Sequence, residues 1–305
     1  MKRSERLVDM VKYLLARPHT LIALPFFADR YGAAKSSISE DLAILRQTLA
    51  NDQNGILETV AGAAGGVRYI PFVGKKEATN YLHDLADRIE DPDRILPGNF
   101  VYLSDILGSP QDLQQIGQLI ATKYAYSNVD YVMTIETKGI AIAQAVSRFL
   151  NVPFVMVRRR PKITEGSTIS VNYVASSSER VVMVRRRPKI TEGSTISVNY
   201  VASSSERVEK MELAKRLLPE GSNVLIVDDF MKGGGTLTGM EELVKEFKGT
   251  VAGMCVLCET KYASQKVVDD YQSLIKITEV DRTKKLIKVR PGNFLEQTDF
   301  NRFPK

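Results

Sequence analysis

Two adjacent carboxylates, Asp228 and Asp229, follow a short apolar run and precede a glycine-rich loop. The segment Val224–Thr236 reads VLIVDDFMKGGGT, which predicts a buried strand, the acidic pair, a loop and then a helix from about Thr236. Carboxylates at a strand end can accept hydrogen bonds from sugar hydroxyls or help to hold Mg²⁺. The glycines let backbone N–H groups approach an anion, and a helix N-terminus favours negative charge there. The segment therefore predicts a pocket for a ligand with both hydroxyl and phosphate groups.

Other phosphate-binding motifs do not fit this segment. A P-loop needs Lys and then Ser or Thr directly after the glycines, and here Thr236 follows Gly235 without a lysine. The dinucleotide fingerprint GxGxxG is also absent. For three glycines taken alone, an ordinary turn between a strand and a helix remains the alternative.

A second strand end has a similar layout. The segment VDYVMTIETKGIAIAQAV predicts a strand, then Glu136, Thr137, Lys138 and Gly139, and then a helix. Lys138 would add a positive charge beside a phosphate site. By itself this segment fits an ordinary turn equally well.

An exact repeat lies between these two motifs. Val155–Val181 and Val182–Val208 share all 27 letters, VMVRRRPKITEGSTISVNYVASSSERV. Two copies that are identical in sequence do not indicate a solenoid. A recent duplication, an engineered insertion or a sequence error would each explain them. Each copy holds five basic and two acidic residues, so one copy supplies half of the net charge of +6. An interaction with DNA must therefore be argued from a motif and not from basicity.

The elements around these motifs predict a doubly wound α/β domain with a mainly parallel sheet. Compact apolar runs (VDYVMTIE, VPFVMVR, NVLIVDD and TVAGMCVLCE) have the character of buried strands. Helices are expected between them, over Lys138–Leu150, Glu206–Leu218 and Leu237–Phe247. Ligands of such folds bind beyond the C-terminal ends of the strands, where both motifs would lie.

The first 74 residues have a different pattern, that of a winged helix. We expect a helix over Ser4–Ala16 and a second over Ile22–Tyr31, capped by Thr20 and ended by Gly32. A third helix would be capped by Ser36 or Ser37, with Glu40 completing a capping box. The following segment, LETVAGAAGGVRYIPF, predicts two strands around a glycine-rich turn, which would form the wing.

A helix-turn-helix favours DNA as the partner, although winged helices also serve in protein–protein contacts. The third helix would enter the major groove, and cations on it, on the wing and at the N-terminus would contact phosphates. The candidate DNA-binding residues are Lys2, Arg3, Lys35, Ser36, Ser37, Arg46 and Arg68.

Composition narrows the remaining possibilities. No apolar run reaches the roughly 18–20 residues that a membrane span needs. The only cysteines, Cys255 and Cys258, fall in a predicted buried strand, and His19 and His83 are the only histidines. We therefore expect no metal site, no disulfide and no membrane, and a location in a reducing cytoplasm.

The strand, acidic pair, glycine loop and threonine together resemble the motif of the phosphoribosyltransferases that binds phosphoribosyl pyrophosphate (PRPP). The resemblance implies that the acidic pair addresses the ribose 2′- and 3′-hydroxyls, that Lys232–Thr236 cradles the 5′-phosphate, and that the second strand end binds pyrophosphate. The implied PRPP-binding residues are Asp228, Asp229, Phe230, Met231, Lys232, Gly233, Gly234, Gly235, Thr236, Thr137, Lys138 and Gly139.

The family also has a long loop after the next strand that folds over PRPP, and one copy of the repeat suits that loop. Its cations Arg158, Arg159, Arg160 and Lys162 would meet pyrophosphate or DNA phosphates, or Arg185–Arg187 of the second copy would do so. Two copies depart from the family pattern. The surplus copy is expected to form an exposed excursion or to lack fixed structure.

Nearly the whole chain, with one repeat set aside, resembles the purine operon repressors of Gram-positive bacteria. The likeness lies in LPFFADRYGAAKSSISEDLAIL, PGNFVYLSDILG, TEGSTISVNYV and VLIVDDFMKGGGT. It implies a homodimer with a winged helix over 1–74 and a phosphoribosyltransferase-like effector domain over 75–305. Double-stranded operator DNA would be the partner, and PRPP, possibly with Mg²⁺, the effector that weakens DNA binding. No cofactor would be required.

The alternative is an active purine phosphoribosyltransferase with an accessory winged helix. Such an enzyme needs a hood over the purine base and catalytic groups. Tyr102, Ser104 and Asp105 would line this hood or simply pack within the domain. The phosphate and sugar motifs do not separate the enzyme from the sensor.

Overall fold

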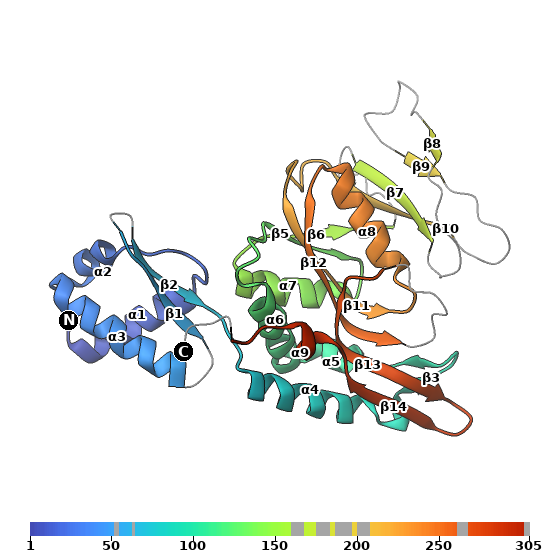
Figure 1. Cartoon of the computed structure of the whole chain (residues 1–305), viewed down its shortest axis with the longest axis horizontal. Coiled ribbons are helices and arrows are strands. Elements are labelled where there is room, and N and C mark those ends of the chain that lie inside the picture. The colour runs from blue at the N-terminus through green and yellow to red at the C-terminus, as the bar shows by residue number, and fades with distance from the viewer. Residues whose placement is uncertain are drawn as a thin grey trace.

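The computed structural model describes residues 1–51, 55–62, 65–159, 168–174, 184–186, 197–199, 208–260 and 268–301. An N-terminal helical domain with a small hairpin stands beside a larger α/β domain (Figure 1). The first domain ends with a strand at Ile70, and the first helix of the second domain begins at Lys75.

The N-terminal domain has the predicted winged-helix order of three helices and an antiparallel hairpin. One apolar core, which includes Met10, Phe27 and Ile38, joins the three helices to the hairpin. The helices are α1 (Arg3–Leu15), α2 (Leu24–Tyr31) and α3 (Lys35–Asn51), and the wing strands are β1 (Ile56–Val60) and β2 (Gly66–Ile70).

Two predicted helix starts are wrong. The residue before α2 is Ala23 and not Thr20, because Ile22 is extended and pairs with Val67 of the wing. Helix α3 already begins at Lys35, so Ser36 and Ser37 lie inside its first turn and do not cap it. The predicted end of α2 is confirmed, since Gly32 has a left-handed backbone with φ of 58°.

The second domain is built on a six-stranded sheet in the order β14-β13-β12-β11-β5-β6. All pairs are parallel except β13 with β14, which confirms the predicted mainly parallel sheet. The strands are β5 (Tyr131–Ile135), β6 (Phe154–Val157), β11 (Asn223–Met231), β12 (Thr250–Thr260), β13 (Gln272–Asp281) and β14 (Leu286–Pro291).

Side chains alternate between the two faces of this sheet, as the period of a strand requires. In β11, Leu225 and Val227 pack toward the helices α4, α6 and α7, while Val224 and Ile226 pack toward α8. The helices are α4 (Lys75–Ile89), α5 (Ser104–Gly108), α6 (Pro110–Tyr124), α7 (Gly139–Leu150), α8 (Gly235–Glu246) and α9 (Phe294–Gln297). A short 3₁₀ helix, Pro92–Arg94, precedes the small hairpin of β3 (Ile95–Leu96) and β4 (Phe100–Val101).

The two copies of the repeat occupy different places. The first copy supplies the end of β6 and β7 (Thr168–Val174), which pairs antiparallel with β10 (Val208–Ala214). The second copy supplies β8 (Val184–Arg186) and β9 (Ser197–Asn199), which pair with each other and lie beyond β7, away from the six-stranded sheet (Figure 1).

The predicted helix over Glu206–Leu218 is wrong. Most of the segment forms β10, in which Met211 and Leu213 are buried in an apolar core and Glu212 and Ala214 are buried between and beside them. The segment forms a strand despite its local helical preference, because β10 pairs with β7 along its full length. Among the described residues, no helix combines the length and apolarity that crossing a membrane requires, and no three potential metal ligands cluster.

Candidate functional site

The two predicted motifs meet at one pocket of about 450 Å³ at the C-terminal ends of β5 and β11. These strands are neighbours in the parallel sheet, so their C-terminal ends emerge at the same edge. The pocket is lined by Ile135, Glu136, Thr137, Lys138, Arg159, Asp228, Asp229, Phe230 and Thr236.

The acidic pair lines the pocket. Asp228 is 5% exposed and Asp229 is half-buried, and the backbone N–H of Asp229 donates to Oδ1 of Asp228 at 2.9 Å. Burial, followed by the charge of Asp229, raises the pKa of Asp228 well above the ordinary carboxyl value. A ligand that donates hydroxyl hydrogen bonds to this carboxylate would relieve part of that cost.

Two helix N-termini border the acidic pair. Thr137 and Lys138 line the pocket directly before α7 begins at Gly139, and Thr236 lines it from the first turn of α8. Gly234 precedes α8 with φ of 89°, a left-handed backbone that strongly favours glycine. Unpaired N–H groups and the dipole at each helix start attract anions, so each of the two helix starts is a candidate anion site beside the carboxylates.

The start of α7 is packed tightly against the acidic strand end. A Cβ atom at Gly139 would lie 2.2 Å from Oγ1 of Thr134 and 2.9 Å from Oδ1 of Asp228. Thr134 is fully buried, so neither neighbour can move away easily. Glycine is therefore required at Gly139 by this close approach.

The first copy of the repeat contributes a cation to the pocket. Arg159 lines the wall, and its backbone N–H donates to Glu136 at 3.1 Å. Nη1 of the preceding Arg158 pairs with the same carboxylate at 3.3 Å. Glu136 therefore holds the start of the first copy against the pocket. The other two predicted loop cations, Arg160 and Lys162, lie outside the described residues.

Several predicted PRPP-binding residues adjoin the pocket without lining it. Met231 is buried in the core below the loop, and Lys232 is exposed with its Nζ 4.8 Å from the ring centre of Phe100. Their contact with a ligand stays a prediction. Gly233 and Gly234, directly before α8, and Gly235, its first residue, are all buried.

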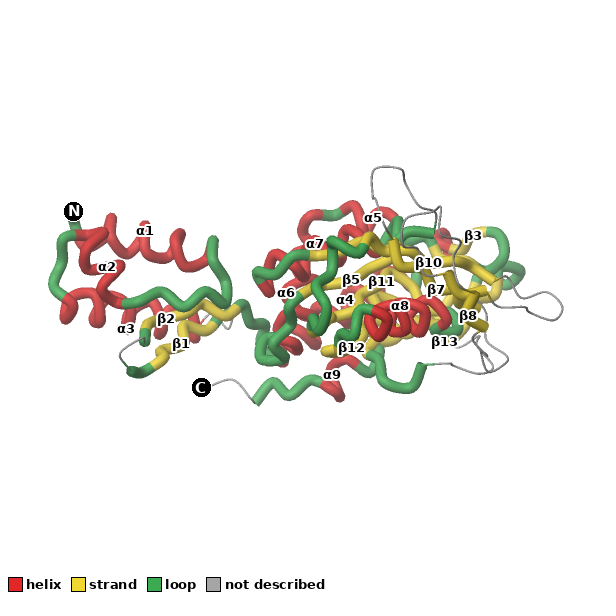
Figure 2. Tube along the Cα trace, turned by 90° about the horizontal axis from the view of Figure 1, so that it is seen from above, coloured by secondary structure: helices red, strands yellow, loops and turns green. Residues whose placement is uncertain are grey.

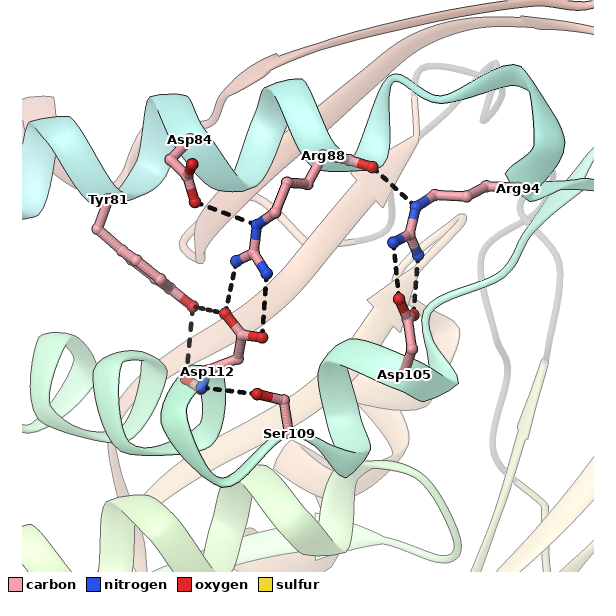
Figure 3. Close-up of polar contacts among 7 residues, drawn as sticks. All are labelled: Tyr81, Asp84, Arg88, Arg94, Asp105, Ser109 and Asp112. Atoms are coloured by element: carbon pink, nitrogen blue, oxygen red, sulfur yellow. Dashed lines mark hydrogen bonds and ion pairs between the residues drawn. The ribbon is translucent and has the colours of Figure 1, made fainter.

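Two of the proposed hood residues, Tyr102 and Asp105, have structural partners, and Figure 3 shows that of Asp105. The guanidinium of Arg94 makes two hydrogen bonds to Asp105, at 2.8 and 2.7 Å, and donates to the carbonyl of Tyr102. Hydrogen bonding to Arg94 lowers the pKa of Asp105. Beside this pair, Arg88 on α4 binds the buried Asp112 of α6. Asp105 thus ties the β3–β4 hairpin to α5.

On the winged helix, the recognition end of α3 is open to solvent. Lys35 and Ser36 are exposed and Ser37 is half-buried, all in the first turn. This end of a recognition helix is the part that reaches base edges. Lys2 lies just before α1 and is exposed. The DNA contacts of these four residues stay predictions.

The three candidate arginines of this domain have partners within it. Arg3 pairs at 2.9 Å with Asp41, which is fully buried. Arg46 donates to the carbonyl of Leu57 and to Thr59 on the wing, and Arg68 pairs with Glu58 across the wing. These contacts fix α3 relative to α1 and to the wing, so each arginine has a structural role beside any contact with phosphate.

Sequence reasoning did not include Ile135 and Glu136 among the site residues. The sequence carries a signal for Glu136, because this carboxylate directly follows a predicted buried strand, as the acidic pair does. Its role as the anchor of the first copy depends on β6 lying beside β5, which no local pattern shows.

The fold and the site define a class of two-domain protein, a winged helix joined to a phosphoribosyltransferase domain. Residues 2–71 match the family "Bacterial purine repressor, N-terminal", and residues 103–289 match "Phosphoribosyl transferase domain". The purine biosynthesis transcriptional repressor PurR of Bacillus subtilis is 47% identical over 96% of this chain and 94% of its own length. The chain therefore belongs to the PurR family of bacterial purine repressors.

Two further relatives show the range of this similarity. The purine biosynthesis transcriptional activator PurR of Lactococcus lactis is 43% identical over 96% of this chain and 98% of its own length. Xanthine phosphoribosyltransferase of Lactococcus lactis is 26% identical over 65% of this chain and 90% of its own length. Full-length relatives are thus regulators, and the enzyme matches a shorter part of the chain.

Proposed function

We propose that the chain is a transcriptional repressor of purine biosynthesis genes that binds operator DNA as a homodimer and is released by PRPP. The proposal rests on the union in one chain of a repressor-family winged helix and a pocket in which two helix N-termini flank an acidic pair. The first part would bind DNA and the second would sense the effector.

The chemistry of the pocket suits PRPP. A ribose with adjacent hydroxyls can donate to Asp228 and Asp229, which lie at the strand end between the two helix starts. The 5′-phosphate would then meet the start of α8, and the pyrophosphate would meet the start of α7 with Lys138 and Arg159. A ligand with a single phosphate would leave one of these anion sites empty.

The effect of PRPP on DNA binding follows from linkage between two sites. If PRPP binds one arrangement of the domains more tightly than another, it favours that arrangement and weakens any DNA complex that needs the other. A homodimer would present two α3 helices to the two half-sites of an operator, which gives a small domain enough contact for specific binding.

A DNA-binding titration tests this proposal. Fluorescence anisotropy with a labelled purine-gene operator would measure the Kd for DNA with and without PRPP and Mg²⁺. We expect PRPP to release DNA from the native protein but not from the variant Asp228→Asn/Asp229→Asn, which should keep its DNA affinity. The exposed adjacent pair Asp269 and Asp270 supplies a matched control, since its double Asn variant should respond like the native protein. Release of DNA from the first variant would contradict the pocket assignment.

The second candidate, an active purine phosphoribosyltransferase, is favoured by the similarity to the xanthine enzyme. Incubation with PRPP, Mg²⁺ and each purine base distinguishes the two functions. We expect PRPP binding without formation of nucleotide. Substantial turnover with any base would reject a sensor that leaves its ligand intact.

The sign of regulation needs its own measurement, because full-length relatives include a repressor and activators. Transcription in vitro from a purine promoter should fall when the protein is added and recover when PRPP is added. An increase on adding the protein would make this chain an activator that uses the same two domains.

A further inference from the structure

Helix α7 spans the effector domain from the ligand pocket to the junction with the winged helix. It begins at Gly139, directly after pocket residues Thr137 and Lys138, and ends at Leu150. Its 12 residues give it a length of about 18 Å. In both overall views α6 and α7 lie on the side of the effector domain that faces the winged helix (Figures 1 and 2).

The pocket end of α7 cannot move independently of the acidic pair. The backbone at Gly139 is in close contact with Thr134 and Asp228, with no room even for a methyl group. Along its length α7 is also packed closely on α6, since a Cβ at Gly117 would lie 2.7 Å from Cβ of Ala145. A displacement at the strand end would therefore move α7, and α6 with it, as one unit.

The other end of α7 contacts the winged helix through a polar side chain. Asn151 follows the helix with a left-handed backbone, and its Nδ2 donates to Oγ1 of Thr20 at 3.1 Å. Thr20 lies in the segment between α1 and α2. This contact ties the DNA-binding domain to the end of the helix whose start borders the ligand pocket.

The junction around this contact has room for movement. A cleft of about 630 Å³ lies between the two domains, with Arg148 and Phe149 on one wall and Pro18 and Tyr69 on the other. By contrast, the chain that links the domains is fixed to α6, because Gln118 donates to the carbonyl of Phe72. The winged helix is thus held at the linker and steadied at Asn151 across an open cleft.

We propose that a displacement of α7 transmits ligand binding from the pocket to the winged helix. Asn151 is the positioning residue that connects α7 to the winged helix. This inference rests on the proposed function, in which PRPP weakens DNA binding. It adds the elements that connect the ligand pocket to the winged helix. Asn151 would touch neither PRPP nor DNA. Its hydrogen bond to Thr20 would set the orientation of the winged helix and change when α7 shifts.

The test compares variants of the full chain at the two ends of this contact. Asn151→Gly keeps the left-handed backbone without strain and removes the amide, and Thr20→Val removes the hydroxyl. Asn151→Asp keeps an oxygen that can accept a hydrogen bond from the Thr20 hydroxyl. Asn128 supplies a matched control, since it is exposed with φ of 50° and lies before β5, so Asn128→Gly makes the same chemical change elsewhere.

The measured quantity is the ratio of the DNA Kd with PRPP to that without it, beside the PRPP Kd and the thermal midpoint. Allosteric couplings are typically roughly 5- to 150-fold, so the native ratio should be well above one. Asn151→Gly and Thr20→Val should bring it close to one without changing PRPP affinity or thermal midpoint. Combining the two changes should add nothing further. Asn151→Asp and Asn128→Gly should keep the native ratio.

The outcomes separate this inference from the function on which it rests. A native protein that binds PRPP without any change in DNA affinity would reject the proposed function. If PRPP weakens DNA binding by the native protein and Asn151→Gly shows the same Kd ratio, the route through α7 is rejected. The proposed function then still stands. A loss of PRPP affinity in Asn151→Gly would also reject it, because Asn151 would then act on the pocket itself.

Discussion

The two copies of the repeat have the same 27 residues and different structures. In the first copy, Val157 ends a strand of the six-stranded sheet and Arg159 lines the ligand pocket. In the second copy, the equivalent residues Val184 and Arg186 lie in β8, which pairs only with the short β9 among the described strands. The difference shows that the neighbours of a segment, and not its own residues, decide which strand it joins.

The pairing of the second half of the repeat shows the same effect. In the first copy, Thr168–Val174 pairs over its whole length with β10, a strand that begins at the last residue of the second copy. In the second copy, only Ser197–Asn199 forms a strand, and its partner is β8. The second copy is therefore an insertion between β7 and β10. The first copy supplies strands of the main body of the domain.

The largest predicted difference between the copies concerns stability. Val157 is fully buried, so Val157→Asp would place a charge in the apolar core. We expect a loss of more than about 4 kcal/mol, enough to unfold the effector domain. The identical change in the second copy, Val184→Asp, should have little effect on the denaturation midpoint. Equal losses would show that both copies belong to the folded core.

The next difference concerns ligand affinity. Arg159→Ala removes a cation from the pocket wall, and we expect PRPP affinity to fall roughly 10- to 100-fold, as for the loss of a charged hydrogen bond. The equivalent change in the second copy, Arg186→Ala, should leave the Kd for PRPP unchanged. Isothermal titration calorimetry would measure both values. The reverse result would mean that the second copy closes the pocket when PRPP is bound.

Removing one copy should have a smaller effect. Because the copies are identical, deleting either one yields the same chain, in which only residues 175–180 would join β7 to the next strand. The shorter connection lowers the entropy cost of closing the hairpin, so stability should rise by about 1–2 kcal/mol in urea denaturation. Affinities for DNA and PRPP should stay the same. A lower free energy of unfolding for the shortened chain would instead show that the second copy stabilises the fold.

The smallest effect is a shift in pH dependence. Burial and Asp229 raise the pKa of Asp228, while the charge of Arg159 lowers it. Ribose hydroxyls would donate to the ionised carboxylate, so PRPP should bind more tightly as pH rises through that pKa. In Arg159→Ala the rise in affinity should move to higher pH, and in Arg186→Ala it should not move. Titrations at a series of pH values would show the shift, and a profile unaffected by Arg159→Ala would place its charge away from Asp228.

Much of the site follows from local sequence. Asp228 and Asp229 are recognisable because they directly follow a buried apolar run, although β11 continues past them to Met231. Gly234 before α8 is recognisable because a left-handed turn at a helix start favours glycine. The winged helix was predictable for a similar reason, since apolar spacing within each helix sets its buried face.

Other features depended on contacts between distant segments. The strand β10 was expected to be a helix, because nothing within Glu206–Leu218 reveals that β7 will pair with it. The start of α2 differs from the predicted one because Ile22 pairs with the wing through Val67. Arg3 and Arg68 looked like free cations, and their carboxylate partners were apparent only after folding.

The sequence by itself determined the two domains, the parallel sheet and the acidic strand end, because hydrophobic period and turn chemistry are local properties. Only the tertiary structure decided which copy of the repeat supplies Arg159, and it also placed Glu136 as the anchor of that copy. The physical reason is that two identical segments have identical local preferences. The partners available at β5 and β10 for the first copy, and at β9 for the second, are what distinguish them.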